Sequence, residues 1–204
     1  MDRYDRTTAL VVVDLQNDFA DPAGSLAVTG GQAVIAAVND QLAAAIAAGA
    51  LVVFTQDWHP DVTPHFAKDG GVWPVHCVAD TWGAALHPGV TVPARAHRIR
   101  KGSGGEDGYS GFTVRDPVSG ATSATELEGL LRDAGVERVV VVGLATDYCV
   151  KATALDAAAL GFETVLLTGA IAAVDLAPGE GDRAIEEMRA AGVRIEPGTG
   201  QERR

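Results

Sequence analysis

The 204-residue sequence lacks the features of a secreted, membrane-spanning or nucleic-acid-binding protein. It has only two cysteines, Cys77 and Cys149, too few for a disulfide scaffold, and this predicts a reducing, cytoplasmic location. No apolar run approaches the ~18 residues of a membrane span, and the N-terminus passes into a predicted strand without the apolar segment of a signal peptide. Lysine and arginine number 16 against 27 acidic residues, and the net charge of -11 argues against binding to nucleic acid or an anionic membrane.

What the sequence contains is the composition and pattern of an α/β protein. Hydrophobic residues make up 47% and charged residues 21%, as in soluble globular proteins, and the length predicts a single domain over residues 1–204. Short apolar runs typical of buried strands alternate with helical patterns. The predicted strands are residues 9–13, 51–55, 97–101, 138–143, 164–168 and 193–196, and the predicted helices are residues 31–49, 123–134, 150–160 and 182–191. This alternation predicts a three-layer αβα fold around a six-stranded parallel sheet.

Two local signals add detail to this prediction. The strand at 97–101 is more polar than the others, which places it near an edge of the sheet. Ser123 and Glu126 have the spacing of a capping box, which predicts that a helix begins at Ser123. A homo-oligomer is left open, because helices inside a subunit and helices at an interface show the same pattern.

Cys149 is the candidate nucleophile. It follows the apolar strand at 138–143, and the carboxyl end of such a strand lies at the rim where open α/β folds bind ligands. It also begins a predicted helix, where free N–H groups and the helix dipole can stabilise a thiolate. Asp147, in the turn before it, is interpreted as a helix cap.

Two charged residues end other predicted strands at the same rim. Asp14 ends the first strand, with the aromatic Phe19 beyond it as a candidate pocket wall, and Lys101 ends the third. An ammonium group near Cys149 would lower the pKa of the thiol, and a neighbouring carboxylate would hold that ammonium in place. Taken singly, Asp14 could be a turn residue and Lys101 a solvated charge. Asp18 is interpreted as a solvated turn residue.

The long irregular segment at 56–96 carries several residues of the types that bind metals. These are Asp57, His59, His65 and His76. A connection of this length inside a compact domain is usually functional. Carboxylate and imidazole ligands suit zinc, iron or manganese, and ligands from loops can leave a coordination position open for substrate. The alternative is that the histidines are simply exposed on the loop. Cys77 is interpreted as a buried small residue.

Five motifs, in this order, resemble those of the nicotinamidases among the isochorismatase-like cysteine hydrolases: VVVDLQNDF, DWHP, WPVHC, RKGSGGEDGYSGF and VVGLATDYCV. The resemblance implies the isochorismatase-like hydrolase fold with six parallel strands. It also implies a catalytic triad of Asp14, Lys101 and Cys149. The implied ligands of one divalent metal, zinc with iron or manganese as alternatives, are Asp57, His59 and His76, with His65 at a fourth position that varies among members.

The resemblance further implies how a substrate is held. The Leu144–Ala145 peptide bond is expected to be cis, so that the N–H groups of Ala145 and Cys149 form an oxyanion hole. The substrate ring is expected to lie among Phe19, Trp73 and Tyr148. The implied activity is the hydrolysis of a small-molecule amide, nicotinamide and also pyrazinamide, to the acid and ammonia through a thioester, as a step of NAD salvage.

Other functions remain open from the sequence. A related cysteine amidase acting on a carbamoyl or ureido substrate would share Asp14, Lys101 and Cys149 but generally not the metal ligands, so bound metal discriminates between the two. A catalytically silent metal-binding relative would not need all three of these residues. An isochorismate-type vinyl-ether hydrolase would not use the cysteine.

Overall fold

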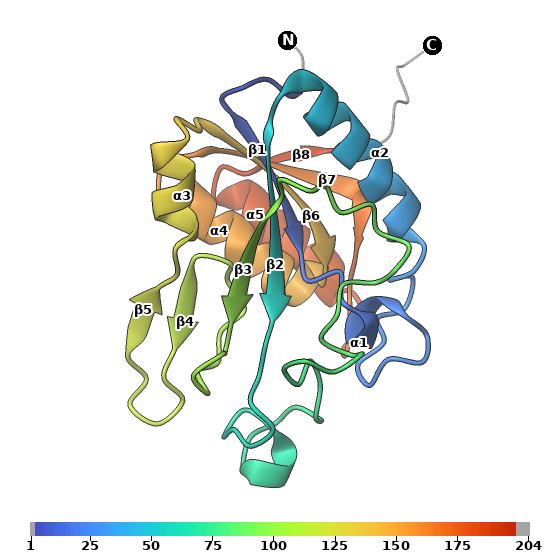
Figure 1. Ribbon diagram of the computed structural model, residues 1–204, viewed down its shortest axis with the longest axis vertical. Helices are drawn as coiled ribbons and strands as arrows, with labels where there is room; N and C mark the ends of the chain where they lie inside the picture. Colours follow the sequence, from blue (N-terminus) through green and yellow to red (C-terminus); the bar gives the residue numbers. More distant parts are fainter. Residues whose placement is uncertain (1–2, 199–204) are drawn as a thin grey trace.

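A six-stranded parallel sheet forms the centre of the computed structural model, which describes residues 3–198 (Figure 1). Its strand order is β3-β2-β1-β6-β7-β8, and every neighbouring pair is parallel. The strands are β1 (Thr8–Val13), β2 (Leu51–Asp57), β3 (His97–Lys101), β6 (Arg138–Leu144), β7 (Glu163–Ala172) and β8 (Arg194–Glu196). The predicted parallel sheet of six strands is confirmed, and so is the position of residues 97–101 at an edge. The predicted domain limits, residues 1 and 204, lie outside the described residues.

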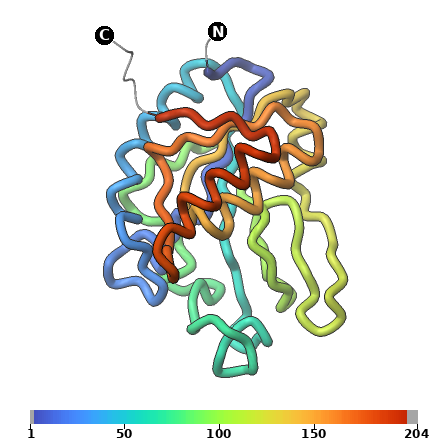
Figure 2. The backbone as a smooth tube through the Cα atoms, turned by 180° about the vertical axis from the view of Figure 1, so that it is seen from behind, coloured from blue at the N-terminus to red at the C-terminus, as the bar shows by residue number. Residues whose placement is uncertain are grey.

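Helices cover both faces of this sheet. The helix α2 (Val34–Ala48) packs on one face, and α3 (Leu127–Asp133), α4 (Lys151–Ala159) and α5 (Glu180–Ala190) pack on the other. Seen from behind, α4 and α5 lie side by side across their face (Figure 2). The three-layer αβα prediction is therefore confirmed. Within residues 3–198, none of the helices has the length and hydropathy needed to cross a membrane.

The continuous valine runs have a direct structural reason. Successive side chains of a strand point to opposite faces, so a central strand with helices on both faces needs an apolar residue at every position. In β1, Leu10 and Val12 belong to the core under α2, whereas Val11 and Val13 belong to the core under α4. Each such side chain contributes about 1.5–3 kcal/mol when it is fully buried. The sheet can therefore hold polar residues rigidly at its carboxyl ends.

The structure differs from the predicted elements between the third and fourth strands of the sheet. An antiparallel hairpin, β4 (Thr113–Arg115) with β5 (Thr122–Ala124), occupies part of a region that had been assigned to loop and helix. The capping-box prediction is wrong, because Ser123 pairs with Val114 in this hairpin. The helix begins four residues later, and the hydroxyl of Thr125 accepts a hydrogen bond from the Leu127 N–H at 3.2 Å. A short helix α1 (Asn17–Ala20) was also not predicted.

One glycine of β6 is required by close backbone contact. Gly143 has φ +112°, and a Cβ atom on it would lie 2.1 Å from the carbonyl oxygen of Val13 in β1. Gly161 also has a positive φ, +86°, but a Cβ atom there would meet no atom within 4 Å. An alanine at either position would be strained by the positive φ. Only at Gly143 would its Cβ atom also collide with a neighbouring strand.

We therefore expect Gly143→Ala to destabilise the protein far more than Gly161→Ala. The left-handed conformation should cost Gly161→Ala about 1–2 kcal/mol. Gly143→Ala should lose at least ~2 kcal/mol more, because the backbones of β1 and β6 must separate. Urea unfolding of both variants measures the difference. Equal losses would contradict the close contact.

Candidate active site

The three predicted triad residues come together at the carboxyl end of the sheet. The ammonium nitrogen Nζ of Lys101 lies 2.7 Å from Oδ2 of Asp14 and 3.5 Å from Sγ of Cys149. All three residues are buried: the exposed fraction is 1% for Lys101, 0% for Asp14 and 7% for Cys149. The group is therefore shielded from bulk water, where charge interactions would be weak.

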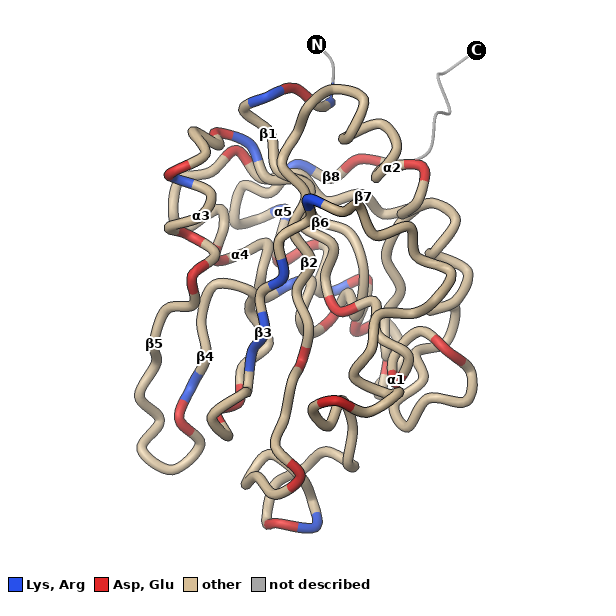
Figure 3. Tube along the Cα trace, in the orientation of Figure 1, with Lys and Arg blue, Asp and Glu red and all other residues tan. Residues whose placement is uncertain are grey.

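Strand geometry explains why a lysine is buried here. β3 carries most of its basic residues on the exposed side, and Figure 3 shows them along the strand. Only Ile99 and Lys101 of this strand are buried, because alternate residues point toward the core. Lys101 pairs in register with Asp57 at the end of β2, which sets their side chains next to each other. The distance from Lys101 Nζ to Asp57 Oδ1 is 2.5 Å.

Asp14 and Cys149 reach the group through two unusual turns. Asp14 leaves β1 with φ +46°, and the hydroxyl of Thr55 donates a hydrogen bond of 2.6 Å to its Oδ1. Cys149 lies in a π-helical turn, Thr146–Val150, that follows the cis peptide bond between Leu144 and Ala145. The cis bond agrees with the resemblance. This turn runs directly into α4, so Cys149 lies near the start of a helical segment, and α4 itself (Lys151–Ala159) is close to the predicted helix at 150–160.

Lys101 is shared between two carboxylates, where the sequence predicted one. Burial raises the pKa of the Cys149 thiol well above its usual value; Lys101 opposes this shift, and Asp14 and Asp57 add to it. Lys101 does lower the thiol pKa, as expected, but burial outweighs its effect. Cys149 is a protonated thiol at neutral pH, and it needs a base to become a nucleophile.

The environments of the two carboxyl groups separate their pKa values. Burial raises the pKa of Asp14, and this effect exceeds the opposing attraction of Lys101. For Asp57 burial also acts upward, but Lys101 and His59 together bring its pKa well below the usual range. Asp57 thus favours the charged form, whereas Asp14 takes up a proton more readily. A pair of carboxyl groups separated in this way is suited to divide charge stabilisation from acid–base chemistry.

Three of the predicted metal ligands form a buried cluster beside this group. Suitable side-chain nitrogens of His59, His65 and His76 all lie within 4.8 Å of one another. Oδ2 of Asp57 lies 3.9 Å from Nε2 of His59 and 3.8 Å from Nε2 of His76. The structure thus brings these four residues together, and the alternative of exposed loop histidines is wrong, because all three are buried.

The chemistry of the cluster fits a transition metal. Both ring nitrogens of His59 are buried without a hydrogen-bond partner, which is costly unless another group binds them. Nδ1 of His76 lies 2.7 Å from the carbonyl oxygen of Pro74 and must donate to it, so Nε2 is left as a ligand atom. Burial lowers the pKa of His65 to about 4, which keeps its imidazole neutral. Neutral imidazoles with a carboxylate are a donor set typical of zinc, iron or manganese.

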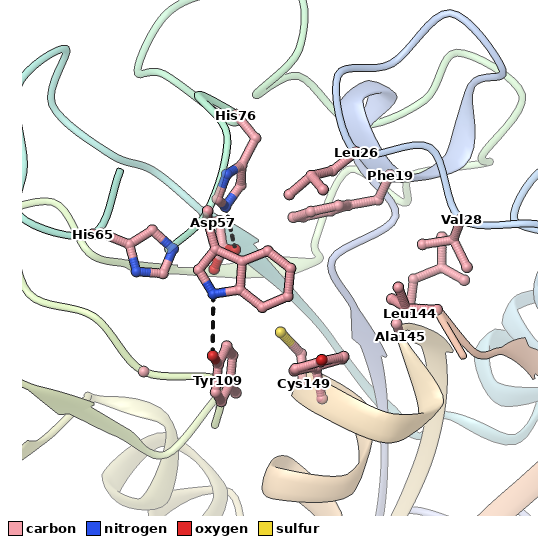
Figure 4. A pocket seen from close by; sticks show the side chains of 14 residues that line it. Phe19, Leu26, Val28, Asp57, His65, His76, Tyr109, Leu144, Ala145 and Cys149 are labelled. Atoms are coloured by element: carbon pink, nitrogen blue, oxygen red, sulfur yellow. Dashed lines mark hydrogen bonds and ion pairs between the residues drawn. The ribbon is translucent and has the colours of Figure 1, made fainter. Parts of the chain in front are cut away.

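A pocket separates the histidine cluster from Cys149 (Figure 4). It contains about 500 Å³ of empty space, which includes its open mouth. Phe19, Trp73 and Tyr148, the three residues expected to hold a substrate ring, line it. Sequence reasoning missed several other lining residues, namely Leu26, Val28, Gly108, Tyr109, Leu144 and Val174. The hydroxyl of Tyr109 accepts a hydrogen bond of 3.1 Å from Nε1 of Trp73.

Two aspartates that were interpreted as local features instead fix the loops of the pocket. The carboxylate of Asp147 accepts hydrogen bonds from the N–H groups of Val174 at 3.0 Å and Asp175 at 2.9 Å, so it does not cap a helix. Asp18 is buried, not solvated, and accepts a hydrogen bond of 2.7 Å from the N–H of Cys77.

Of the missed pocket residues, Tyr109 could have been found as an aromatic residue in the glycine-rich segment after Lys101.

The whole fold and its motifs match a known family. A family model of the isochorismatase domain matches residues 8–197, and the chain therefore belongs to the isochorismatase family. Within that family it is similar to a nicotinamidase/pyrazinamidase of Mycobacterium tuberculosis, with 42% identity over 92% of this chain and 97% of the relative. The resemblance to nicotinamidases seen in the motifs thus extends over most of the chain.

Two solved structures show the same similarity. A pyrazinamidase of Pyrococcus horikoshii in complex with zinc superposes with a TM-score of 0.82 and 42% identity, covering 93% of this chain and 98% of that one. An L. infantum protein in complex with nicotinate also has a TM-score of 0.82, with 39% identity over 93% of this chain and 92% of its own.

The ion group at the end of the sheet makes a prediction about stability. Lys101→Met should cost about 3–5 kcal/mol, because it leaves two buried carboxylates without their cation. Lys68→Met is the control: Lys68 pairs with Asp69 at 2.8 Å at the surface and should cost less than ~1 kcal/mol.

The cost of Lys101→Met should also depend on pH. Without the ammonium the buried carboxyl groups have folded pKa values above their unfolded ones, so the variant should regain stability as the pH falls and protonates them. Urea unfolding at several pH values measures this. A loss that is equal for both lysines, or that grows toward low pH, would contradict the ion group.

Proposed function

We propose that the chain is a nicotinamidase, which hydrolyses nicotinamide, and also pyrazinamide, to the acid and ammonia in NAD salvage. The observation that carries this proposal is the pocket itself, which has the histidine cluster on one side and Cys149 on the other (Figure 4). Nicotinamide is a flat ring with a nitrogen at one position and a carboxamide at another, so it offers one group to each side. The names of the relatives support the same activity.

In this proposal His59, His65, His76 and Asp57 would hold one divalent metal, zinc with iron or manganese as alternatives. The metal would supply a Lewis-acidic position for the ring nitrogen of the substrate. Phe19 and Trp73 line the same pocket and would hold the two faces of the ring, with Tyr148 at its border. The side chains thereby direct the carboxamide toward Cys149.

Asp14 acts as the general base in the first half of the reaction. It accepts the proton of the Cys149 thiol while Lys101 stays protonated and stabilises the charge of the group. The thiolate sulfur then bonds to the carboxamide carbon, and the carbonyl oxygen takes up the negative charge. The N–H groups of Ala145 and Cys149 donate to this oxyanion, and one such donor typically contributes about 3 kcal/mol.

The same carboxyl group completes the cycle. Asp14 returns its proton to the nitrogen, the C–N bond breaks, and ammonia leaves a thioester on Cys149. Asp14 then accepts a proton from a water molecule, which attacks the thioester carbon. The C–S bond breaks, the thiol is re-formed with that proton, and the carboxylic acid is released. The raised pKa of Asp14 suits a group that must both take and return a proton.

Removal of the sulfur tests the proposed nucleophile. Cys149→Ala should abolish ammonia release from nicotinamide but retain the metal, because sulfur is not part of the histidine cluster. Cys77→Ala is the control, since Cys77 is the second buried free cysteine and should leave turnover within a few-fold of the wild type. Ammonia release and bound metal are measured on the same preparations. Turnover by the Cys149→Ala variant would contradict the mechanism.

Removal of the metal tests the substrate class. Ammonia release from nicotinamide should fall on treatment with a chelator and return when zinc, iron or manganese is added. The added metal would again supply the position that binds the ring nitrogen of the substrate. A panel of small amides with and without chelator provides the measurement. A carbamoyl or ureido compound turned over in preference to nicotinamide, and unaffected by the chelator, would identify a different amidase.

A further inference from the structure

Among residues 3–198, no strand pairs with the end of β2 on one of its two sides. The ladder between β1 and β2 runs from the pair Ala9 and Leu51 to the pair Val12 and Phe54, and β1 then turns away at Asp14. In a strand, the N–H and C=O of one residue point to the same neighbouring strand. The N–H of Trp58 bonds to the Lys101 carbonyl of β3 at 2.8 Å, so the backbone groups of the preceding residue face the missing extension of β1.

The side chain of Gln16 occupies this place. Its Oε1 accepts a hydrogen bond of 2.8 Å from the N–H of Asp57, and its Nε2 donates one of 2.7 Å to the Asp57 carbonyl oxygen. Nε2 also donates to the carbonyl oxygen of Ala84 at 2.9 Å. Because an N–H can only donate and a carbonyl can only accept, these partners fix the orientation of the amide. Gln16 is fully buried and acts as one further peptide group of β1.

Asp57, the residue that Gln16 holds, faces two parts of the site at once. One carboxylate oxygen of Asp57 lies 2.5 Å from Lys101 Nζ, and the other lies 3.9 Å and 3.8 Å from Nε2 of His59 and His76. A rotation of the Asp57 backbone would move both oxygens, so it would disturb the ammonium and the histidine cluster together. From this geometry we infer that Gln16 is a positioning residue that fixes Asp57 for both the metal cluster and Lys101.

This inference rests on the proposed function for its link to catalysis, but the metal cluster can be tested without substrate. The chain provides a matched control in Gln56, which is also buried, with 3% exposed, and donates to the same Ala84 carbonyl at 2.9 Å. The side chain of Gln56 makes no hydrogen bond to the backbone of Asp57 within residues 3–198. Methionine is close to glutamine in size and removes only the amide.

The experiment compares Gln16→Met with Gln56→Met. Zinc affinity is measured by competition with a chromogenic chelator, and kcat and KM for nicotinamide are measured on the zinc-loaded proteins. Gln16→Met should bind zinc about 10–100-fold more weakly and lose a similar factor in kcat. Gln56→Met should stay within about threefold of the wild type in both, while unfolding measurements show whether the two variants lose comparable stability.

Equal zinc affinity in Gln16→Met and the wild type, or equal weakening in both variants, would overturn the inference. If Gln16→Met does not fold, Gln16→Asn takes its place under the same criteria, because its shorter amide cannot span both backbone groups. A wild type that binds zinc but releases no ammonia from nicotinamide would count against the proposed function alone. The zinc titration of the variants would still decide the role of Gln16.

Discussion

The ammonium group of Lys101 between two buried carboxylates is the interaction on which the rest of the site depends. It joins the ends of β1, β2 and β3, and its third neighbour is the sulfur of Cys149. Burial of three charges is costly, and only their close mutual contact offsets the loss of hydration. The apolar core under both faces of the sheet makes such a contact possible, because it fixes the strand ends that carry these side chains.

The two carboxyl groups around that ammonium differ in what they can do. Asp57 has a pKa well below the usual range and keeps its charge, while burial raises the pKa of Asp14 and allows it to carry a proton. The thiol beside them is also protonated, since burial raises its pKa. In the proposed mechanism the resting site therefore holds a protonated thiol beside a proton acceptor, Asp14, and the thiolate forms when that proton is transferred.

The sequence predicted the features that repeat along the chain and missed those that depend on distant contacts. The apolar runs of β1 and β6 reveal burial on both faces, and the strand ends that follow them gave Asp14 and Cys149. The hairpin β4–β5 has no such pattern in its three-residue strands. Asp18 and Asp147 were interpreted from their chain neighbours, but Asp18 accepts a hydrogen bond from Cys77, 59 residues away, and Asp147 accepts one from Val174, 27 residues away. The lowering of the Cys149 pKa by Lys101 was predicted, but the larger opposing effect of burial was not, because burial by surrounding segments cannot be read from one position.

The sharing of Asp57 has a thermodynamic consequence. The carboxylate faces the histidine cluster with one oxygen and Lys101 with the other, so an ion bound at the histidines would be linked to the Lys101 ammonium. Linkage is reciprocal: if ion binding at the histidines changes the proton affinity around Cys149, then the protonation state around Cys149 must change the affinity for the ion by the same factor. In the proposed enzyme, metal retention and the acidity of the Cys149 thiol would therefore change together whenever Asp57 is disturbed.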